Sequence, residues 1–146
     1  MQVSTKGRYA LRLMVDLGSA EPDYYTPLRE VSERQSISEK YLEQIVRPLS
    51  KAGLVTSARG VFGGYKLAQD PENITVGQIL RSVEGELAPI PCSKREAECI
   101  RTNTCVTKDV WQSIKESVDQ VVDNITLQEL VNRSSQNRGA CPSELV

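Results

Sequence analysis

A chain of 146 residues, 39% hydrophobic and 25% charged, is the right size for one domain, or for one small domain with an appendage. No stretch approaches the roughly 20 apolar residues of a membrane-spanning helix and no signal segment opens the chain, so we expect a cytoplasmic protein without a membrane partner. The formal charge is +3 over residues 1–66, which contain 10 Lys and Arg and 7 Asp and Glu. It is −4 over residues 67–146, which contain 8 Lys and Arg and 12 Asp and Glu. This asymmetry is expected when a nucleic-acid-binding segment is joined to a separate segment for sensing or dimerisation.

Two helices are predicted in the first part of the chain. Apolar residues recur at helical spacing between Ser4 and Leu17, and the Ser4 hydroxyl is suited to cap the first turn. Thr26 followed by Pro27 is a typical helix start, with threonine as the cap and proline in the first helical position. This start predicts a short helix that ends at Glu33.

A third helix and a hairpin are predicted next. Ser36 and Glu39 have the spacing of a capping box and predict a helix that continues to about Ala52, with Pro48 inside it. Two short β-prone runs joined by a glycine-rich tip then predict a hairpin over residues 54–67.

The second half of the chain contains three predicted helices. A short helix is predicted over residues 75–83, and the longest one runs from about residue 107 to residue 123. Thr126 and Glu129 have the spacing of a second capping box, which starts a terminal helix. The polar tail after Asn132 is expected to be disordered.

The order of these elements predicts the fold class. Two short helices followed by a hairpin are typical of a winged helix-turn-helix, so we expect a mainly α fold with a small β-hairpin wing and a long C-terminal helix. The expected segments are a winged helix-turn-helix domain (1–83, with the helix-turn-helix at about 26–52 and the wing at about 54–67), a cysteine-containing loop (84–106), the long and terminal helices (107–132) and the tail (133–146).

The third predicted helix is the expected reader of the DNA major groove. Its exposed face is expected to carry polar groups that reach phosphates and base edges, namely Ser38, Lys40, Tyr41, Glu43 and Gln44. At the hairpin tip, Arg59 beside Gly60 is placed for a narrow minor groove, where the negative potential favours arginine. A protein–protein module with a solvated polar face would show the same pattern.

The longest predicted helix carries one apolar stripe. Its members recur at i, i+3, i+4 and i+7 and are Val110, Trp111, Ile114, Val118, Val121, Val122 and Ile125. Such a stripe packs against the chain's own core, against a partner, or against both.

The chain contains four cysteines and no histidine. Without histidine, Cys–His and Ser–His catalytic pairs are excluded, and we do not expect an enzyme. Cys92, Cys99 and Cys105 have the spacing C-x6-C-x5-C, which differs from the C-x2-C pair of a zinc ribbon. Three thiolates in one loop are suited to a soft metal site, but the pattern also allows a thiol redox sensor or incidental cysteines.

Long ordered motifs over roughly residues 1–132 resemble the IscR-type family of iron–sulfur-cluster-responsive winged helix-turn-helix regulators. The motifs that carry the resemblance are Ser4-Thr5-Lys6-Gly7-Arg8-Tyr9-Ala10-Leu11, the segments 31–38 and 41–44, Gly53-Leu54-Val55, Arg59-Gly60, Gly63-Gly64-Tyr65, the three loop cysteines, Trp111, Asn124-Ile125-Thr126-Leu127 and Leu130-Val131.

The resemblance implies a homodimer that pairs through the long C-terminal helix and binds a pseudo-palindromic operator on double-stranded DNA. It implies that Glu43 and Gln44 read bases, with Glu43 discriminating between operator classes, and that Arg59 enters the minor groove. Lys40 stands where the family has a small hydroxyl residue, so the operator sequence of the family cannot be assigned to this chain.

The resemblance also implies one 2Fe–2S cluster per subunit, held by the three loop cysteines and supplied by cluster-assembly proteins, and control of cluster-biogenesis genes. The family's fourth ligand is a histidine, and that position is Lys108 here. Cys141, Asp109, Glu98 and an external group are the candidates that replace it. Arg8 stands where a nitric-oxide-sensing relative has its acidic ligand, which argues against a 4Fe–4S site of that type.

Three other functions remain open on the sequence. The chain could be a clusterless member of the family that regulates cysteine or sulfur metabolism through a protein partner. It could be a thiol redox-sensing repressor or a thiol oxidoreductase, although no C-x-x-C motif supports the latter. A zinc-bound structural module is the third alternative.

Overall fold

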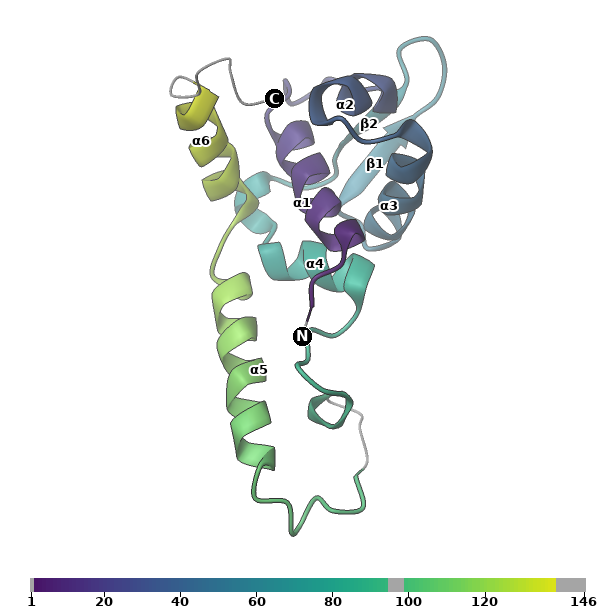
Figure 1. The fold of residues 1–146 in the computed structure, drawn as a ribbon. Coiled ribbons are helices and arrows are strands. Elements are labelled where there is room, and N and C mark those ends of the chain that lie inside the picture. The colour runs from purple at the N-terminus through teal and green to yellow at the C-terminus, as the bar shows by residue number, and fades with distance from the viewer. Residues whose placement is uncertain (1, 95–98, 139–146) are drawn as a thin grey trace.

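The computed structural model describes residues 2–94 and 99–138. These residues form an N-terminal domain, from which one long helix extends, and a last helix that returns to the domain (Figure 1). The elements in chain order are α1 (Thr5–Gly18), α2 (Leu28–Gln35), α3 (Glu39–Lys51), β1 (Val55–Ala58), β2 (Gly64–Leu67), η1 (Pro71–Asn73), α4 (Val76–Glu84), η2 (Pro91–Ser93), α5 (Lys108–Asp123) and α6 (Leu127–Arg138). None of the described helices is long and apolar enough to cross a membrane.

Helix α1 is the centre of the N-terminal domain. Its predicted cap is confirmed, because the Ser4 hydroxyl accepts a hydrogen bond from the backbone N–H of Gly7 at 3.3 Å. Its apolar face packs against α3, α4 and α6 and builds the main core. The largest fully buried core side chains are Leu13, Met14, Val31, Leu42, Ile45, Val46, Leu49, Ile74, Ile79 and Leu127.

The start of α2 differs from the prediction. Pro27 occupies the cap position, and no side chain caps the helix. Thr26 is fully buried, and its backbone exchanges two hydrogen bonds of 2.8 Å with Tyr65 of β2. The prediction that Thr26 caps α2 is wrong, because this residue is engaged as a one-residue third strand beside the hairpin.

The capping signal between α2 and α3 is displaced by two residues. Ser36 has a left-handed backbone (φ 54°) and ends α2 instead of starting α3. Ser38 is the actual cap, and its hydroxyl accepts from the N–H of Tyr41 at 3.2 Å. The predicted capping box of Ser36 and Glu39 is therefore wrong. Pro48 lies inside α3, as predicted.

The hairpin forms as predicted, in an antiparallel register that pairs Val55 with Leu67 and Ala58 with Gly64. Gly64 is required where the hairpin meets α2. Its φ is 156°, and a Cβ there would overlap the backbone carbonyl of Thr26. This close approach holds the last strand pair before the turn against the start of α2 and leaves residues 59–63 as a projecting tip.

The C-terminal helices are tied to the N-terminal domain by backbone pairing. The N–H of Val76 donates to the Ile125 carbonyl at 2.9 Å, and the N–H of Leu127 donates to the Ile74 carbonyl at 2.8 Å. The predicted capping box of α6 is present, with Glu129 N–H donating to the Thr126 hydroxyl at 3.2 Å.

Helix α6 is longer than predicted. It continues to Arg138, so the prediction of a disordered tail is wrong for residues 133–138. The Ser135 hydroxyl donates to the Val131 carbonyl at 3.1 Å, and Arg133 pairs with Glu129 one turn earlier at 3.7 Å. These contacts within the helix support a segment that is polar in composition. Residues 139–146 lie outside the described part of the chain.

Candidate DNA-binding surface, apolar helix face and cysteine loop

The α3 helix presents a polar face to solvent. Lys40, Glu43 and Gln44 are exposed and lie on one side of the helix, while its opposite side is buried in the core. Arg47 continues the same face one turn later and is also exposed. Arg47 was not among the residues predicted for this face, although its spacing of i+3 from Gln44 and i+4 from Glu43 was a readable signal. Ser38 is exposed at the start of α3, and its hydroxyl caps the helix.

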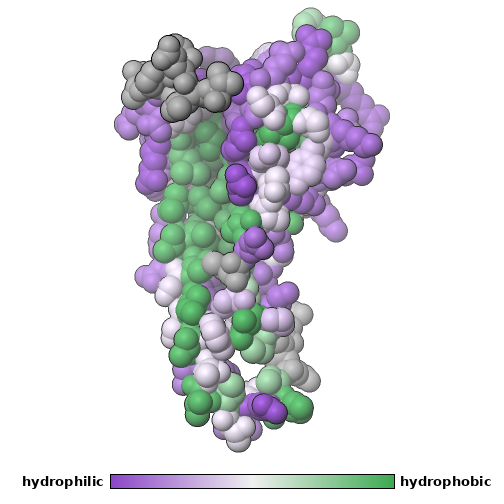
Figure 2. All heavy atoms as spheres, in the orientation of Figure 1, coloured by the Kyte–Doolittle hydropathy of each residue, from purple (hydrophilic) through white to green (hydrophobic). Residues whose placement is uncertain are grey.

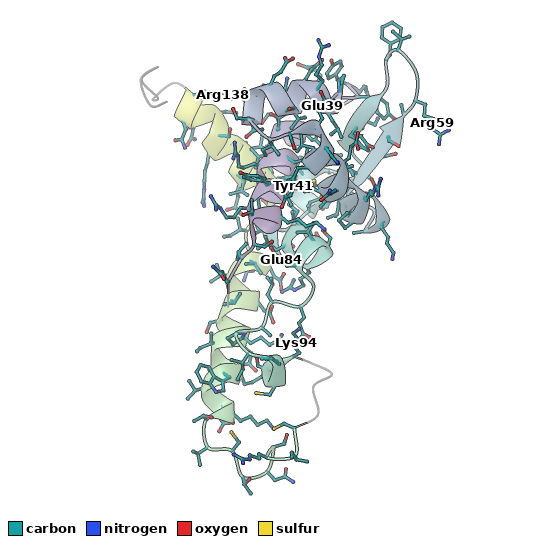
Figure 3. All side chains as sticks on the ribbon, turned by 45° about the vertical axis from the view of Figure 1, so that its right-hand side comes forward. Glu39, Tyr41, Arg59, Glu84, Lys94 and Arg138 are labelled. Carbon is teal, nitrogen blue, oxygen red and sulfur yellow. The ribbon has the colours of Figure 1, made fainter. Side chains whose placement is uncertain are left out.

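Tyr41 differs from the other residues predicted on this face. It is half-buried, and its ring packs edge-on against Tyr9 of α1, with the ring centroids 5.7 Å apart. The Arg12 guanidinium lies 5.3 Å from the centroid of the Tyr9 ring. Tyr41 is therefore a contact between α1 and α3 rather than a freely exposed side chain, and it helps to set the orientation of α3 (Figure 3).

The hairpin tip carries the second part of the predicted surface. Arg59 and Gly60 are both exposed, and Arg59 projects outward from the hairpin (Figure 3). Val61 and Phe62 follow them and are almost fully exposed. These two residues were predicted only as part of a glycine-rich turn. Two consecutive large apolar residues in a turn were the signal that could have identified them.

A buried carboxylate joins α1 to α2 beneath this surface. The Asp16 side chain is 1% exposed and accepts hydrogen bonds from Arg34, with Nη2 to Oδ1 at 2.7 Å and Nε to Oδ2 at 3.0 Å. Gln35 donates a further hydrogen bond of 3.0 Å to Oδ2. The hydrogen bond to Asp16 raises the pKa of Arg34 above its ordinary value. An acidic residue inside the apolar run of α1 was the sequence signal for this contact.

Glu84 connects the end of α4 to the start of α1. One carboxylate oxygen accepts from the N–H of Ser4 at 2.9 Å and from the N–H of Gly7 at 3.1 Å, and the Ser4 hydroxyl also contacts it. A Cβ on Gly7 would overlap this carboxylate. The negative charge satisfies free N–H groups at the positive end of the α1 dipole (Figure 3). Because Glu84 precedes the cysteine loop directly, it links that loop to the N-terminal domain.

The apolar stripe on α5 is divided between two environments. Val118 and Val122 are half-buried and pack near Val76 and Leu80 of α4. The outer edge of the stripe remains open, with Val110, Ile114 and Val121 exposed and Trp111 half-buried. Figure 2 shows this edge as a continuous apolar band along α5.

The open edge of the stripe also contains a shallow depression of about 430 Å³. It is lined by Ser113, Ile114, Ser117, Val118, Val121 and Val122. A band of this kind on a projecting helix is larger than scattered surface apolar residues would produce.

An ion-pair network fixes α5 against α4. Arg81 of α4 pairs with Asp119 and Asp123 of α5, both at 2.6 Å. Lys115 pairs with Asp119 at 2.6 Å and with Glu86 at 3.4 Å. Burial alone would raise the pKa of Asp119, but hydrogen bonds from Lys115 and Arg81 outweigh this and lower it.

The cysteine loop joins α4 to α5. Cys92 in η2 and Cys105 near the start of α5 are exposed, and Cys99 between them is partly exposed. Within residues 2–94 and 99–138, no group of three or more cysteine and acidic side chains is close enough together to hold a metal ion. The structure therefore does not bring the three predicted ligands together. Of the candidate fourth ligands, Asp109 is exposed in the first turn of α5, whereas Glu98 and Cys141 lie outside the described residues.

The donor chemistry of the loop nevertheless fits a soft metal or a cluster. Three thiols are the ligands that iron–sulfur clusters use. The Thr107 hydroxyl lies 3.3 Å from the Cys105 sulfur, and its hydrogen bond lowers the pKa of Cys105, which favours the thiolate that binds iron. Metal sites are often assembled only when the metal binds, because unscreened thiolates repel one another.

Comparison with known proteins gave consistent matches over most of the chain. The Rrf2 family, described as "Iron-dependent Transcriptional regulator", matches residues 3–133. The chain is 41% identical over 132 residues to the HTH-type transcriptional regulator IscR of Yersinia pseudotuberculosis, covering 90% of this chain and 80% of IscR. It is 38% identical over 132 residues to the HTH-type transcriptional regulator CymR of Bacillus subtilis, covering 90% and 91%. The solved structure of that CymR, titled the global cysteine regulator of B. subtilis, has a TM-score of 0.78 and 37% identity, covering 91% of this chain and 98% of CymR.

Proposed function

We propose a function from the premise that this chain belongs to the Rrf2 family of transcriptional regulators. Membership confirms the predicted resemblance to IscR-type regulators, and the structural match to CymR confirms the mainly helical fold with a hairpin wing. The relatives are transcriptional regulators rather than enzymes, as the missing histidine suggested.

On this proposal, the protein is a cytoplasmic homodimer that binds a pseudo-palindromic operator. The observation that carries this proposal is the polar face of α3, which is exposed over Lys40, Glu43 and Gln44 while its other side is buried. A face of this kind fits the major groove, where Gln pairs with adenine and Glu accepts from cytosine. Arg59 at the hairpin tip reaches the adjacent minor groove. Pairing of two α5 stripes places two such readers on one duplex.

The proposed signal is the state of one 2Fe–2S cluster per subunit, donated by cluster-assembly proteins, with cluster-biogenesis genes as the targets. Cys92, Cys99 and Cys105 would hold the cluster. Bound there, it would supply iron–thiolate bonds across the loop. The support is the donor chemistry of the loop, the family description as iron-dependent and the identity with IscR.

The loop is well placed to affect DNA binding. It begins at Glu84, which caps α1, and ends at the first turn of α5. A conformational change of the loop on cluster binding would therefore affect both the N-terminal domain and α5, the helix that we propose as the dimer contact. A change in the position of α5 relative to α4 alters the distance between the two α3 helices, and with it the operator preference.

The test is anaerobic purification of the full chain, followed by absorbance and iron analysis of the wild type and of Cys92→Ala. We expect a coloured, iron-containing wild type and a variant that has lost most of its iron. Titration of a promoter fragment with both proteins should then show different affinities. Cys141→Ala and Asp109→Ala serve as separate tests of the fourth ligand. A colourless, iron-free wild type that still responds to oxidants would overturn the cluster proposal.

A second candidate is a clusterless regulator of cysteine or sulfur metabolism. It is favoured by the likeness to CymR, whose solved structure is titled the global cysteine regulator of B. subtilis. The same iron analysis distinguishes the cluster-sensing regulator from the clusterless one. A wild type that binds DNA tightly without iron would support the clusterless function.

A further inference from the structure

The hairpin tip exposes the two most prominent apolar side chains of the N-terminal domain. Val61 is 95% and Phe62 is 92% exposed, and Phe62 is the only phenylalanine of the chain. Figure 2 shows apolar atoms at the far end of the hairpin, separated from the apolar band on α5 by polar surface. A side chain of this size that contacts almost nothing in its own subunit gains from burial only when another molecule covers it.

The tip is held in place by the structure below it. The strands pair up to Ala58 and Gly64, and the N–H of Gly63 donates to the Gly60 carbonyl at 3.0 Å, which closes the turn. The Thr26 bridge to Tyr65 anchors the hairpin to the start of α2. Phe62 is therefore presented on a short, braced loop, which reduces the entropy lost when a partner binds it.

We propose that Phe62, with Val61 beside it, packs against the deoxyribose edges of the DNA minor groove where Arg59 enters. This inference rests on the proposed DNA binding and adds to it an apolar, sequence-independent contact. The minor groove is lined by sugar C–H groups, and proteins that enter it frequently combine arginine with apolar side chains. Phe62 lies three residues beyond Arg59 in the same tip, so both side chains belong to the part of the hairpin that we propose to enter the groove.

DNA is a better occupant for this tip than a protein partner. The patch is only two residues long and lies directly beside Arg59 and Gly60, so it continues the proposed DNA-binding surface. The neighbouring charge also matches a polyanion, because Arg59 and the exposed Lys40 and Arg47 of α3 belong to the same domain. A stable protein interface would need a much larger apolar area than two side chains provide.

The test uses the salt dependence of binding to separate apolar from ionic contacts. The full-length wild type, Phe62→Ala and Arg59→Ala are titrated by fluorescence anisotropy against a duplex selected from a random pool by the wild type, over a series of salt concentrations. We expect Phe62→Ala to weaken binding about tenfold at every salt concentration, with an unchanged slope of log Kd against log salt, because no phosphate contact is lost. Arg59→Ala should reduce that slope by about one.

One further variant and a footprint make the result specific. Phe62→Leu should retain most of the affinity, because it keeps a large apolar side chain at the exposed tip. Hydroxyl-radical footprinting reports the exposure of deoxyribose, and Phe62→Ala should lose protection at the flanks of the operator. The melting temperature of Phe62→Ala should equal that of the wild type, because the ring contacts almost nothing in the free protein.

The outcomes distinguish this inference from the proposed function. Wild-type affinity and footprint in Phe62→Ala would overturn the inference alone, and would leave the tip to a protein partner. A wild type that selects and binds no duplex would overturn the proposed DNA binding, and the inference with it. A changed salt slope in Phe62→Ala would mean that the ring acts through Arg59 and would also overturn the apolar contact.

Discussion

Among single residues, the buried carboxylate of Asp16 shows how a charge stabilises the helix pair that supports the reading helix. Asp16 lies in the apolar side of α1, and Arg34 and Gln35 of α2 satisfy its oxygens. Arg34 remains 43% exposed in its side chain, whereas Asp16 is almost completely enclosed. The loss of stability should therefore depend on whether Arg34 or Asp16 is removed.

We predict that Arg34→Ala destabilises the protein more than Asp16→Ala does. Arg34→Ala leaves a carboxylate in the core with only Gln35 as its partner, which costs about 3 kcal/mol. Asp16→Ala removes charged hydrogen bonds worth about 2 kcal/mol but allows Arg34 to turn to water. Urea unfolding measures both values. The control is Arg29→Ala, because Arg29 pairs with Glu33 at 3.5 Å on the open surface and its loss should cost less than about 0.5 kcal/mol. The reverse order of the two core variants would contradict the prediction.

At the scale of elements, two acidic contacts set how the helices join. Glu84 at the end of α4 caps the start of α1, across 80 residues of sequence. Asp119 of α5 lies between Arg81 of α4 and Lys115, so that α5 extends from the domain at a defined angle (Figure 1). Glu84 begins the cysteine loop, and Lys115, which pairs with Asp119, also pairs with Glu86 of that loop. A change in the conformation of the loop can therefore reach α1 through Glu84 and can reach α5 through the ion pairs of Lys115.

We predict that the contribution of Asp119 to stability disappears as the pH falls below about 4. The pKa of Asp119 is lowered in the folded protein, so its stabilising effect is present above the unfolded value and is lost as the pH falls through the folded value. Arg81 and Lys115 remain protonated throughout. Urea unfolding followed by the fluorescence of Trp111, the only tryptophan, is measured for the wild type and Asp119→Asn at several pH values.

The difference between these two proteins isolates Asp119 from the other carboxylates. Asp119→Asn should be less stable than the wild type at pH 7, and the two should converge under acid conditions. A difference that stays constant from pH 7 to acid would show that the ionised carboxylate is not what joins α4 to α5.

At the scale of the whole molecule, the position of α5 makes the apolar stripe available to a second copy. The helix extends from the N-terminal domain (Figure 1). Val110, Ile114 and Val121 are exposed along its length. The inner edge of the stripe already packs against α4. One helix thus serves the chain's own core on one side and offers the other side for pairing, which is the arrangement that we propose for the dimer.

We predict that Val121→Glu converts the dimer to a monomer, because two carboxylates would be buried in a symmetric apolar contact. Affinity for the operator should fall at least 100-fold, since binding of two half-sites by one molecule is lost. Analytical ultracentrifugation and anisotropy titration measure the two effects. Gln120→Glu, on the neighbouring exposed position, adds the same charge and should remain a dimer with nearly unchanged affinity. A dimeric Val121→Glu would remove α5 as the proposed interface.

Local pattern in the sequence was sufficient for most elements. Ser4 as the cap of α1, the hairpin at the glycine-rich tip, Pro48 inside α3 and the capping box at Thr126 all appear in the structure. Each depends on residues within a few positions of one another. The apolar spacing of α5 and the exposed polar side of α3 were also readable, because helical periodicity assigns residues to faces without knowledge of the rest of the fold.

The tertiary structure alone decided which of several local options was used. Thr26 is a suitable helix cap, but its backbone is hydrogen-bonded to Tyr65 instead. Tyr41 has a position on the exposed side of α3, but its ring packs against Tyr9. Glu84 reaches Ser4, and no local pattern signals a partner 80 residues away. The physical reason is that caps and helix faces depend on neighbours in sequence, whereas burial and long-range hydrogen bonds depend on which distant segments pack together.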